Sequence, residues 1–259
     1  MQKENRIIGE NDIAIHKFEN GYSFNDNIKS VFYNKSDFIK NGIEKEINSS
    51  GFFKNNTKKE IGFISFKPES ILIPYNIFDE NSQNLYFNDN LSNNNKLRLY
   101  FDVINSKEIV NLYRLEEDDF FKKLYLTNKV SIVSHYKTII LNTLLKINKE
   151  DLKENIVYIN LQKDSFDIFY FIEDKFNLSN SFKINNTDDF LYYFFYFTEQ
   201  FNLKPEAFSI VFLGKYIFFE DYYLGIRNFQ TNISFLSNPT DNKGYIENHP
   251  APFLANVYC

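Results

Sequence analysis

The histidines and the cysteine of this sequence could serve as metal ligands, bases or nucleophiles. His16, His135 and His249 have no second His, Cys or carboxylate at the spacing of a zinc site. Cys259, at the last position, lacks the surrounding scaffold that activates a catalytic thiol, which favours a structural role. The sequence also contains no Gly-x-Ser-x-Gly elbow and no Gly-x-x-x-x-Gly-Lys phosphate loop. We therefore predict no catalytic residue and no metal site.

Two pairs of adjacent carboxylates, Asp118-Asp119 and Asp188-Asp189, are the next candidates for chemistry. Each pair lies near the predicted start of a helix, where negative charge opposes the positive end of the helix dipole. We therefore interpret both pairs as residues that stabilise helices.

Composition excludes several classes of protein. The chain has 259 residues and a formal net charge of -5, and 19% of its residues are aromatic, with 30 Phe, 18 Tyr and no Trp. The aromatic content excludes a disordered chain, and the single Cys excludes a disulfide scaffold. The slightly acidic balance gives no support to nucleic-acid binding, so core packing explains the aromatic residues better than base stacking.

The most apolar window, Phe190–Phe197, bears on the compartment of the protein. It is far shorter than the roughly 20 residues that span a bilayer, and acidic residues flank it. The first residues of the chain lack the apolar core, about 7 to 15 residues long, of a secretory signal. We expect a cytoplasmic protein without membrane insertion, in which this window forms a helix buried on most sides.

The elements that must position any site form two successive sets. The first set begins with a hairpin over 12–24, because Asn20-Gly21 separates two segments of alternating polarity. A strand over 30–33 and a helix over 37–47 follow. Asn55-Asn56 and Asn93-Asn94-Asn95 are interpreted as turns. Further strands are predicted at 61–66, 70–74, 97–104, 109–115 and 129–133, and further helices at 116–125 and 135–147.

The second set also opens with a hairpin, over 156–171, in which Lys163-Asp164 forms the turn. A third strand is predicted at 175–184, and Asn186 or Thr187 then caps a helix that ends near 201. Strands at 208–214 and 231–236 flank a segment over 217–226 for which we favour a helix. A final short helix is predicted within 249–259.

The two hairpins can be overlaid without a gap. The overlay places Ile13 on Val157, His16 on Asn160, Phe18 on Gln162 and Asn20-Gly21 on Asp164-Ser165. The later elements also share their order, which favours an internal duplication over a chance match of two amphipathic hairpins. We place the first unit at 1–150 and the second at 151–259.

Segments along nearly the whole chain resemble one family. They are VYINLQKDSFDIFYF, NSFKINNTDDFLYYFFYFTEQFNL, FSIVFLGK and HPAPFLANVYC in the second half, and DIAIHKFENGYSF and SILIPYNIFDE in the first. The chain resembles a Bacteroidetes family designated only as a domain of unknown function, DUF3822. The resemblance implies the actin-like ATPase superfamily of sugar kinases, actin and heat-shock chaperones, with similarity to pilus-assembly platform proteins. The implied fold is α/β, with two duplicated, ribonuclease H-like subdomains facing a cleft.

In active members of that superfamily, each first strand ends in an Asp-x-Gly turn. Its carboxylate holds the metal, and its glycine lets backbone amides approach the phosphates. Here His16-Lys17-Phe18 and Asn160-Leu161-Gln162 stand at these positions, so both carboxylates and both glycines are absent. A Gly-Gly pair on the adenosine side is reduced to Gly214. The remaining candidates for cofactor binding are Asn160, Gln162, Asp164, Gly214 and Lys215.

These substitutions favour a non-catalytic binding or scaffold protein with a degenerate nucleotide cleft, no cofactor and a protein partner, by analogy with the pilus-platform relatives. The alternative is a divergent nucleotide-binding ATPase or phosphotransferase that binds ATP and magnesium through other acidic groups, such as Asp164 or Asp167. A third hypothesis is a homo-oligomer that uses the sheet edges or the aromatic helix as its interface.

Overall fold

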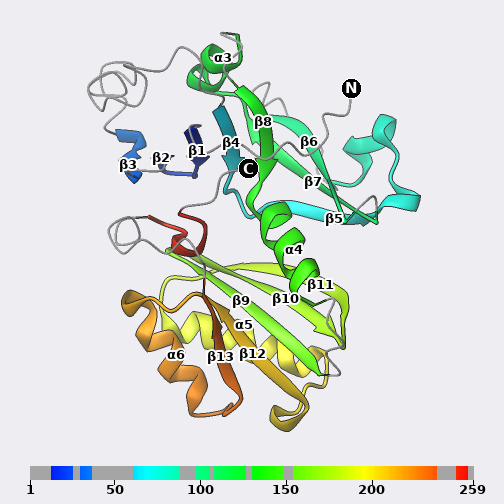
Figure 1. The fold of residues 1–259 in the computed structure, drawn as a ribbon, viewed down its shortest axis with the longest axis vertical. Helices are drawn as coiled ribbons and strands as arrows, with labels where there is room; N and C mark the ends of the chain where they lie inside the picture. Colours follow the sequence, from blue (N-terminus) through cyan, green and yellow to red (C-terminus); the bar gives the residue numbers. More distant parts are fainter. Residues whose placement is uncertain are drawn as a thin grey trace. The chain divides into compact units, whose positions relative to one another are not determined.

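The computed structural model describes residues 13–25, 30–36, 61–87, 97–105, 108–126, 130–148, 154–237 and 249–255 (Figure 1). The chain divides into two units, Met1–Asn142 with Asn256–Cys259, and Thr143–Ala255. The predicted helix over 37–47 and the predicted turns at 55–56 and 93–95 lie outside the described residues.

The first unit contains a five-stranded sheet in the order β3-β2-β1-β4-β8. Its strands are β1 (Ile13–Lys17), β2 (Gly21–Asn25), β3 (Ser30–Asn34), β4 (Ile61–Ser65) and β8 (Val130–His135). β1, β2 and β3 are antiparallel neighbours, whereas β4 runs parallel to β1 and β8 parallel to β4. Gly21 is required at the start of β2, because a Cβ there would lie 2.1 Å from the carbonyl oxygen of Tyr33.

One face of this sheet packs against α3 (Asp119–Leu126). Ile13, Ile15 and Phe63 are fully buried, and the rings of Phe63 and Phe121 meet edge to face at 4.8 Å between centroids. The alternating apolar residues of β1 and β4 form this core because burying them removes apolar surface from water.

A second sheet of the first unit was not anticipated by the repeat. Strands β5 (Ser70–Pro74), β6 (Leu97–Ile104) and β7 (Ile109–Glu116) form an antiparallel sheet in the order β5-β7-β6. The short helices η1 (Tyr75–Ile77) and η2 (Glu80–Leu85) follow β5. The strands were predicted correctly, but their pairing into a separate sheet was not.

The helix predicted at 116–125 was wrong at its start. β7 continues to Glu116 because this residue still pairs with Leu97 of β6. The helix α3 begins only after Asp118, whose carboxylate accepts a hydrogen bond from the amide of Phe121 at 2.9 Å. The predicted helix over 135–147 is observed as α4 (Tyr136–Ile147).

The second unit contains a five-stranded sheet in the order β11-β10-β9-β12-β13. Its strands are β9 (Asn155–Gln162), β10 (Ser165–Ile172), β11 (Lys175–Lys183), β12 (Phe208–Leu213) and β13 (Ile233–Leu236). The strand directions repeat those of the first sheet. The hairpin register repeats too: Ile15 pairs with Phe24 and Ile159 with Ile168, which are equivalent pairs in the ungapped overlay.

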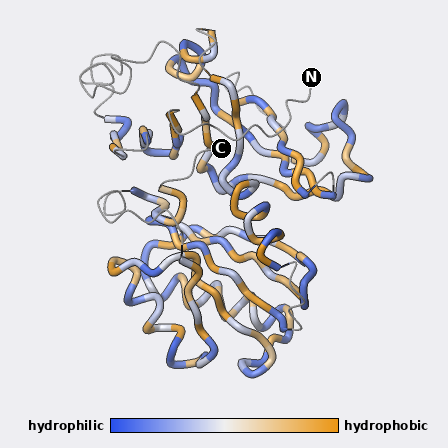
Figure 2. The backbone as a smooth tube through the Cα atoms, in the orientation of Figure 1, coloured by the Kyte–Doolittle hydropathy of each residue, from blue (hydrophilic) through white to orange (hydrophobic). Residues whose placement is uncertain are grey.

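Helices cover this second sheet (Figure 1). They are α5 (Thr187–Gln200) and α6 (Glu220–Arg227). The connecting segments of this unit contain the short helices η3 (Pro205–Ala207), η4 (Ile217–Phe219) and η5 (Pro252–Leu254). Phe190 of α5 meets Phe166 of the sheet at 4.8 Å, and Phe197 meets Tyr170 at 5.8 Å. Figure 2 shows hydrophobic residues along the strands of this unit.

The expectation that α5 is buried on most sides was wrong. Phe190, Phe194 and Phe197 are buried, but Tyr192 is 65% exposed and Tyr196 is 49% exposed. One face of α5 packs on the sheet. The exposed side chains of Tyr192 and Tyr196 lie away from it, as expected for rings with a polar hydroxyl group. Among the described residues, no helix has the length and apolar character needed to cross a membrane.

Candidate functional site

The five candidate residues predicted from the sequence lie at or just after the carboxyl ends of β9 and β12, two interior strands of the second sheet. We call this end of the sheet the β9–β12 edge. Asn160 and Gln162 end β9, Asp164 lies in the turn to β10, and Gly214 and Lys215 follow β12. β12 runs parallel to β9, with Phe212 opposite Ile159, so both strands end on the same side. The fold thus brings the five candidates together at the carboxyl ends of β9 and β12.

Asn160 and Gln162 are bound to a buried carboxylate. The Oδ2 atom of Asp167 accepts hydrogen bonds from Asn160 Nδ2 at 2.9 Å and from Gln162 Nε2 at 3.1 Å, and Ser181 Oγ donates to Oδ1. Asp167 is fully buried and lies opposite Asn160 on one neighbouring strand and Ser181 on the other. These donors offset the cost of burying the charge, so both amide groups serve the protein interior.

The β9–β10 turn is bonded to the C-terminal segment of the same unit. The amide of Lys163 donates to the carbonyl oxygen of Pro250 at 2.8 Å, and the amide of Ile184 donates to the carbonyl oxygen of Asp164 at 3.1 Å. His249 is buried, with Nδ1 at 2.7 Å from the carbonyl oxygen of Ala251, and burial lowers its pKa to about 4. The Lys163 amide in the turn therefore already has an acceptor within the second unit.

Gly214 is covered by an aromatic ring. Its φ of 82° lies in the left-handed region, and a Cβ there would lie 2.3 Å from the ring of Tyr216. The Tyr216 amide donates to the hydroxyl of Tyr223 at 3.1 Å, which fixes the backbone beside the ring. Lys215 places Nζ 5.3 Å from the ring centroid of Phe235, in a cation–π contact. The glycine that remained from the adenosine-side motif thus supports a close contact within the protein.

Three carboxylates lie close enough to Tyr222 to affect its ionisation. Burial raises the pKa of Tyr222, and the carboxylates of Asp164, Asp189 and Asp221 raise it further. These carboxylates belong to the β9–β10 turn and to the starts of α5 and α6. A triphosphate would meet unfavourable charge here, even though Lys215 lies nearby.

The equivalent edge of the first unit is filled differently. Phe18 stacks on Phe66 with ring centroids 4.5 Å apart, and His16 lies 4.9 Å from the same ring. Lys17 is 3% exposed, and its Nζ donates to the Glu116 carbonyl oxygen at 2.6 Å and to Asp118 Oδ2 at 2.8 Å. Burial lowers the pKa of Lys17, and the Asp118 carboxylate opposes this shift.

Asp118 has a second role that the sequence analysis missed. It was interpreted as complementing a helix dipole, and it does bind the amide of Phe121 at the start of α3. It also accepts hydrogen bonds from Lys17 and from the hydroxyl of Tyr22. Because Lys17 and Asp118 lie about a hundred residues apart, sequence spacing held no signal for this pair.

A buried polar cluster around Asp102 was also missed. Asp102 Oδ2 accepts from Ser134 Oγ at 2.9 Å, from the His135 amide at 2.8 Å and from Thr138 Oγ1 at 2.7 Å. Burial raises the pKa of Asp102 to about 6, although these hydrogen bonds act to lower it. Part of the residue remains exposed. A single acidic residue in the apolar strand LRLYFDVI was the signal available. The cluster ties β6 to β8 and α4, so we assign it a structural role.

His135 is held neutral inside this cluster. Its Nε2 lies 2.7 Å from the Lys67 carbonyl oxygen, its Nδ1 accepts from the Lys137 amide at 3.2 Å, and burial lowers its pKa to about 3. Within the described ranges, no group of three or more His, Cys, Asp or Glu side chains could hold a metal ion.

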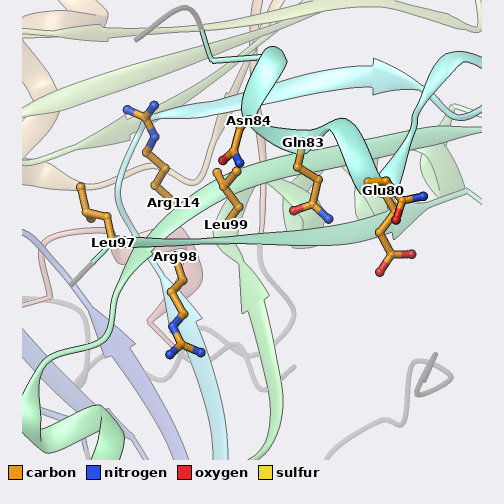
Figure 3. Close-up of a pocket in the computed structure, with 8 residues that line it drawn as sticks. Glu80, Gln83, Asn84, Leu97, Arg98, Leu99 and Arg114 are labelled. Atoms are coloured by element: carbon orange, nitrogen blue, oxygen red, sulfur yellow. The ribbon is translucent and has the colours of Figure 1, made fainter. Parts of the chain in front are cut away.

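A hollow of about 330 Å³ lies elsewhere in the first unit, between η2 and the β6–β7 pair (Figure 3). Figure 3 shows Leu99 and Arg114 on one side of these strands and Arg98 pointing to the other side. Arg114 lies over the ring of Phe87 at 4.3 Å, and Arg98 pairs with Glu117 at 3.0 Å. None of the predicted site residues lines this hollow. Residues 88–96, which precede Leu97, are outside the described range, so we assign no ligand to it.

The two five-stranded sheets of identical order, each with helical cover, define an α/β protein with the actin-like ATPase fold. A Bacteroides thetaiotaomicron protein with this fold and unknown function is similar over 90% of this chain and 93% of its own, with a TM-score of 0.74 and 18% identity. A chain of the PilM-PilN type IV pilus biogenesis complex is similar over 95% of this chain and 96% of its own, with a TM-score of 0.53 and 10% identity.

The chain belongs to the family described as "Protein of unknown function (DUF3822)", whose model matches residues 3–233. This confirms the resemblance noted in the sequence. No curated protein matches the chain.

Proposed function

We propose that this protein is a non-catalytic binding or scaffold protein, a pseudo-ATPase in which the nucleotide site of the actin-like fold is degenerate. One observation carries the proposal: the groups at the β9–β12 edge that would meet a nucleotide are committed to contacts inside the second unit. The side-chain amides of Asn160 and Gln162 bind Asp167, and the turn amide of Lys163 binds Pro250. Releasing the amides of Asn160 and Gln162 would leave buried polar groups unsatisfied, at about 1–3 kcal/mol each.

The first unit supports the same proposal. Phe18 stands where active members of the superfamily carry glycine, and it is 7% exposed because it packs on Phe66 and Phe32. A phosphate could approach the backbone only if this ring left its site. Both halves of the fold therefore oppose nucleotide binding, and we expect no cofactor.

We further propose that the two units arose by internal duplication and that the protein acts in the cytoplasm through a protein partner. The shared sheet order and hairpin register support duplication. A protein partner is an analogy with the PilM-PilN complex, in which a similar chain is part of an assembly. We expect no nucleic-acid partner, because the chain is acidic.

One observation favours the alternative, a divergent nucleotide-binding ATPase or phosphotransferase. The Oδ1 atom of Asn160 is buried and has no hydrogen-bond partner among the described residues. The Nδ2 atom of the same Asn160 side chain donates to the Asp167 carboxylate. The Asn160 oxygen and the Asp167 carboxylate are both oxygen ligands of the kind that divalent metals prefer, at the position where active members hold a metal. A metal–nucleotide complex would need this amide to exchange its present contact for the ion.

Thermal unfolding with and without millimolar ATP and magnesium tests the proposal, because a ligand that binds the native state raises the melting temperature. A site with a Kd one hundredth of the nucleotide concentration would add about 2.7 kcal/mol. We expect no increase over magnesium alone. An increase that disappears in Asp167→Asn would establish the alternative.

The matched variant for the same assay should be Lys215→Glu. A side chain at Gly214 would collide with Tyr216, so Gly214→Glu confounds nucleotide binding with folding. Lys215 is exposed, and its reversal changes the local charge without filling the core. We expect Lys215→Glu to melt at a temperature that is equally insensitive to nucleotide. A nucleotide-induced stabilisation seen only with Lys215 present would contradict the proposal.

A further inference from the structure

Exposed and half-buried apolar side chains lie on α5, on α6 and just after α6. We define the α5–α6 strip as Tyr192, Phe195, Tyr196, Leu224 and Phe229. Leu224 is 49% exposed and Phe229 is 57% exposed, in addition to the two exposed tyrosines of α5. Phe195 and Phe229 meet at 4.7 Å between ring centroids, and Tyr192 stacks on Tyr196 at 6.5 Å. The Phe195–Phe229 contact makes the strip continuous from α5 to the segment that follows α6.

Its continuity distinguishes this strip from scattered surface residues. Single exposed apolar side chains are normal, whereas contiguous apolar patches rimmed by polar groups mark interaction sites. Aromatic residues are also enriched at protein interfaces, because they supply a large contact area at little entropic cost. Phe190, Phe194 and Phe197 already fill the sheet-facing side of α5, so core packing does not account for the strip.

The negative charge of α5 and α6 indicates which kind of partner could bind the strip. The two helices contain five carboxylates, at Asp188, Asp189, Glu199, Glu220 and Asp221, against one basic residue, Arg227. Asp188 precedes Tyr192 by one helical turn, Glu199 follows Phe195 by one turn, and both carboxylates lie on exposed residues. A second copy of this chain docked through the same face would bring like charges together, since a two-fold interface pairs a patch with itself.

We propose that the α5–α6 strip binds an amphipathic helix with basic ends, contributed by a partner protein. The apolar side of that helix would cover the strip, and its Lys or Arg residues would reach Asp188 at one end and Glu199 at the other. The two carboxylates are eleven positions apart along α5, roughly 16 Å at 1.5 Å per residue, which matches three turns of a helix. Amphipathic helices recognise apolar grooves in this way. The inference deepens the proposed function, on which it rests for the existence of a protein partner.

A synthetic helical peptide of eighteen residues tests the proposal. It carries leucines along one face, lysines near both ends and a single Trp among the leucines. A matched peptide has glutamate in place of every lysine. The protein contains no Trp, so the Trp emission reports on the peptide alone. We expect saturable binding of the lysine peptide and at least tenfold weaker binding of the glutamate peptide. Equal binding of both peptides, or no binding of either, would overturn the proposal.

Variants locate the binding surface. The double variant Tyr192→Ser with Phe229→Ser should weaken the lysine peptide at least tenfold, whereas Tyr125→Ser removes an exposed aromatic residue of the first unit and should leave binding unchanged. The double variant Asp188→Lys with Glu199→Lys should reverse the preference in favour of the glutamate peptide. Circular dichroism confirms that each variant is folded. An unchanged preference after charge reversal, or a dimer that Tyr192→Ser dissociates in light scattering, would contradict the proposal.

Failure of this inference is distinguishable from failure of the proposed function. A nucleotide-dependent rise in melting temperature would overturn the pseudo-ATPase assignment and leave the peptide result standing. Absence of peptide binding, with no effect of nucleotide, would overturn only the α5–α6 strip as the docking surface.

Discussion

The two hairpins of this protein, β1–β2 and β9–β10, have the same register but opposite chemistry where they end. In the first, the pair His16 and Ser23 lies beside stacked aromatic rings and a buried Lys17–Asp118 ion pair. In the second, the equivalent pair Asn160 and Asp167 forms a hydrogen-bonded carboxylate cluster. One hairpin is closed mainly by apolar contact and the other by polar contact. The comparison teaches that a single backbone frame can fill the end of its hairpin in two physically different ways.

Removing the central carboxylate of the second hairpin should produce the largest effect. Asp167→Ala leaves two buried amide groups and one half-buried hydroxyl without their acceptor, so the free energy of unfolding should fall by about 4 kcal/mol. The equivalent change in the first hairpin, Ser23→Ala, removes one hydroxyl that donates to Asn25 and should cost about 1 kcal/mol. Urea unfolding of both variants measures the difference, and equal losses would show that the two hairpin ends are not chemically distinct.

A side chain at the retained glycine should have the next largest effect. Gly214→Ala combines a left-handed φ with a collision against Tyr216 and should cost about 3 kcal/mol in urea unfolding. Gly225→Ala is the matched control, since its Cβ would meet the flexible end of Leu191 at 3.3 Å within a helix. We expect the control to change stability by less than about 1 kcal/mol. A tolerated Gly214→Ala would mean that the edge next to β12 is open enough for a ligand.

The buried His249 should make the stability of the second unit depend on pH. Its pKa is about 4 in the folded unit and about 6.5 in an unfolded chain, so the unfolded state binds the extra proton between these values. Its contribution is fully present above pH 6.5 and decreases as the pH falls. The loss should reach about 2 kcal/mol by pH 5. Urea midpoints of the wild type and of His249→Asn, measured above pH 6.5 and at pH 5, isolate the contribution of His249 to the pH dependence. If His249→Asn retains the full pH dependence, the C-terminal segment is not packed as described.

The exposed lysine at the same edge should matter least. Lys215→Ala removes a cation–π contact with Phe235 and should cost about 0.5 kcal/mol. The urea midpoint should therefore hardly change. A loss comparable to that of Gly214→Ala would show that Lys215 supports the edge rather than lying on it.

Local sequence patterns were sufficient to predict the strands and the hairpin overlay. Asn20-Gly21 and Lys163-Asp164 marked the turns, and the alternation of Ile13 and Ile15 marked the face that α3 covers. The sheet of β5, β6 and β7 could not be predicted, because which strands pair depends on contacts between distant segments. The exposed face of α5 was missed because Tyr was counted as apolar, although its hydroxyl can remain in water.

The sequence did not show what each of the five candidate residues contacts. The resemblance brought Asn160, Gln162, Asp164, Gly214 and Lys215 to one sheet edge, where the structure places them. The hydrogen bond from Lys163 to Pro250 joins distant segments and left no sequence signal. The Tyr216 ring lies over Gly214 from only two residues away, but its side-chain direction could not be predicted from the sequence. Asp167 was named only as an alternative source of negative charge, and its three donors come from strands on both sides of it.

The exchange rate of the Lys163 amide proton tests the central claim most directly, because the proposal rests on this N–H being committed to Pro250. It can be followed by nuclear magnetic resonance with and without millimolar ATP and magnesium. The account predicts a protected amide in the free protein, since Pro250 accepts its hydrogen bond, and no change on adding nucleotide. An amide that exchanges freely and becomes protected only when nucleotide is present would contradict it.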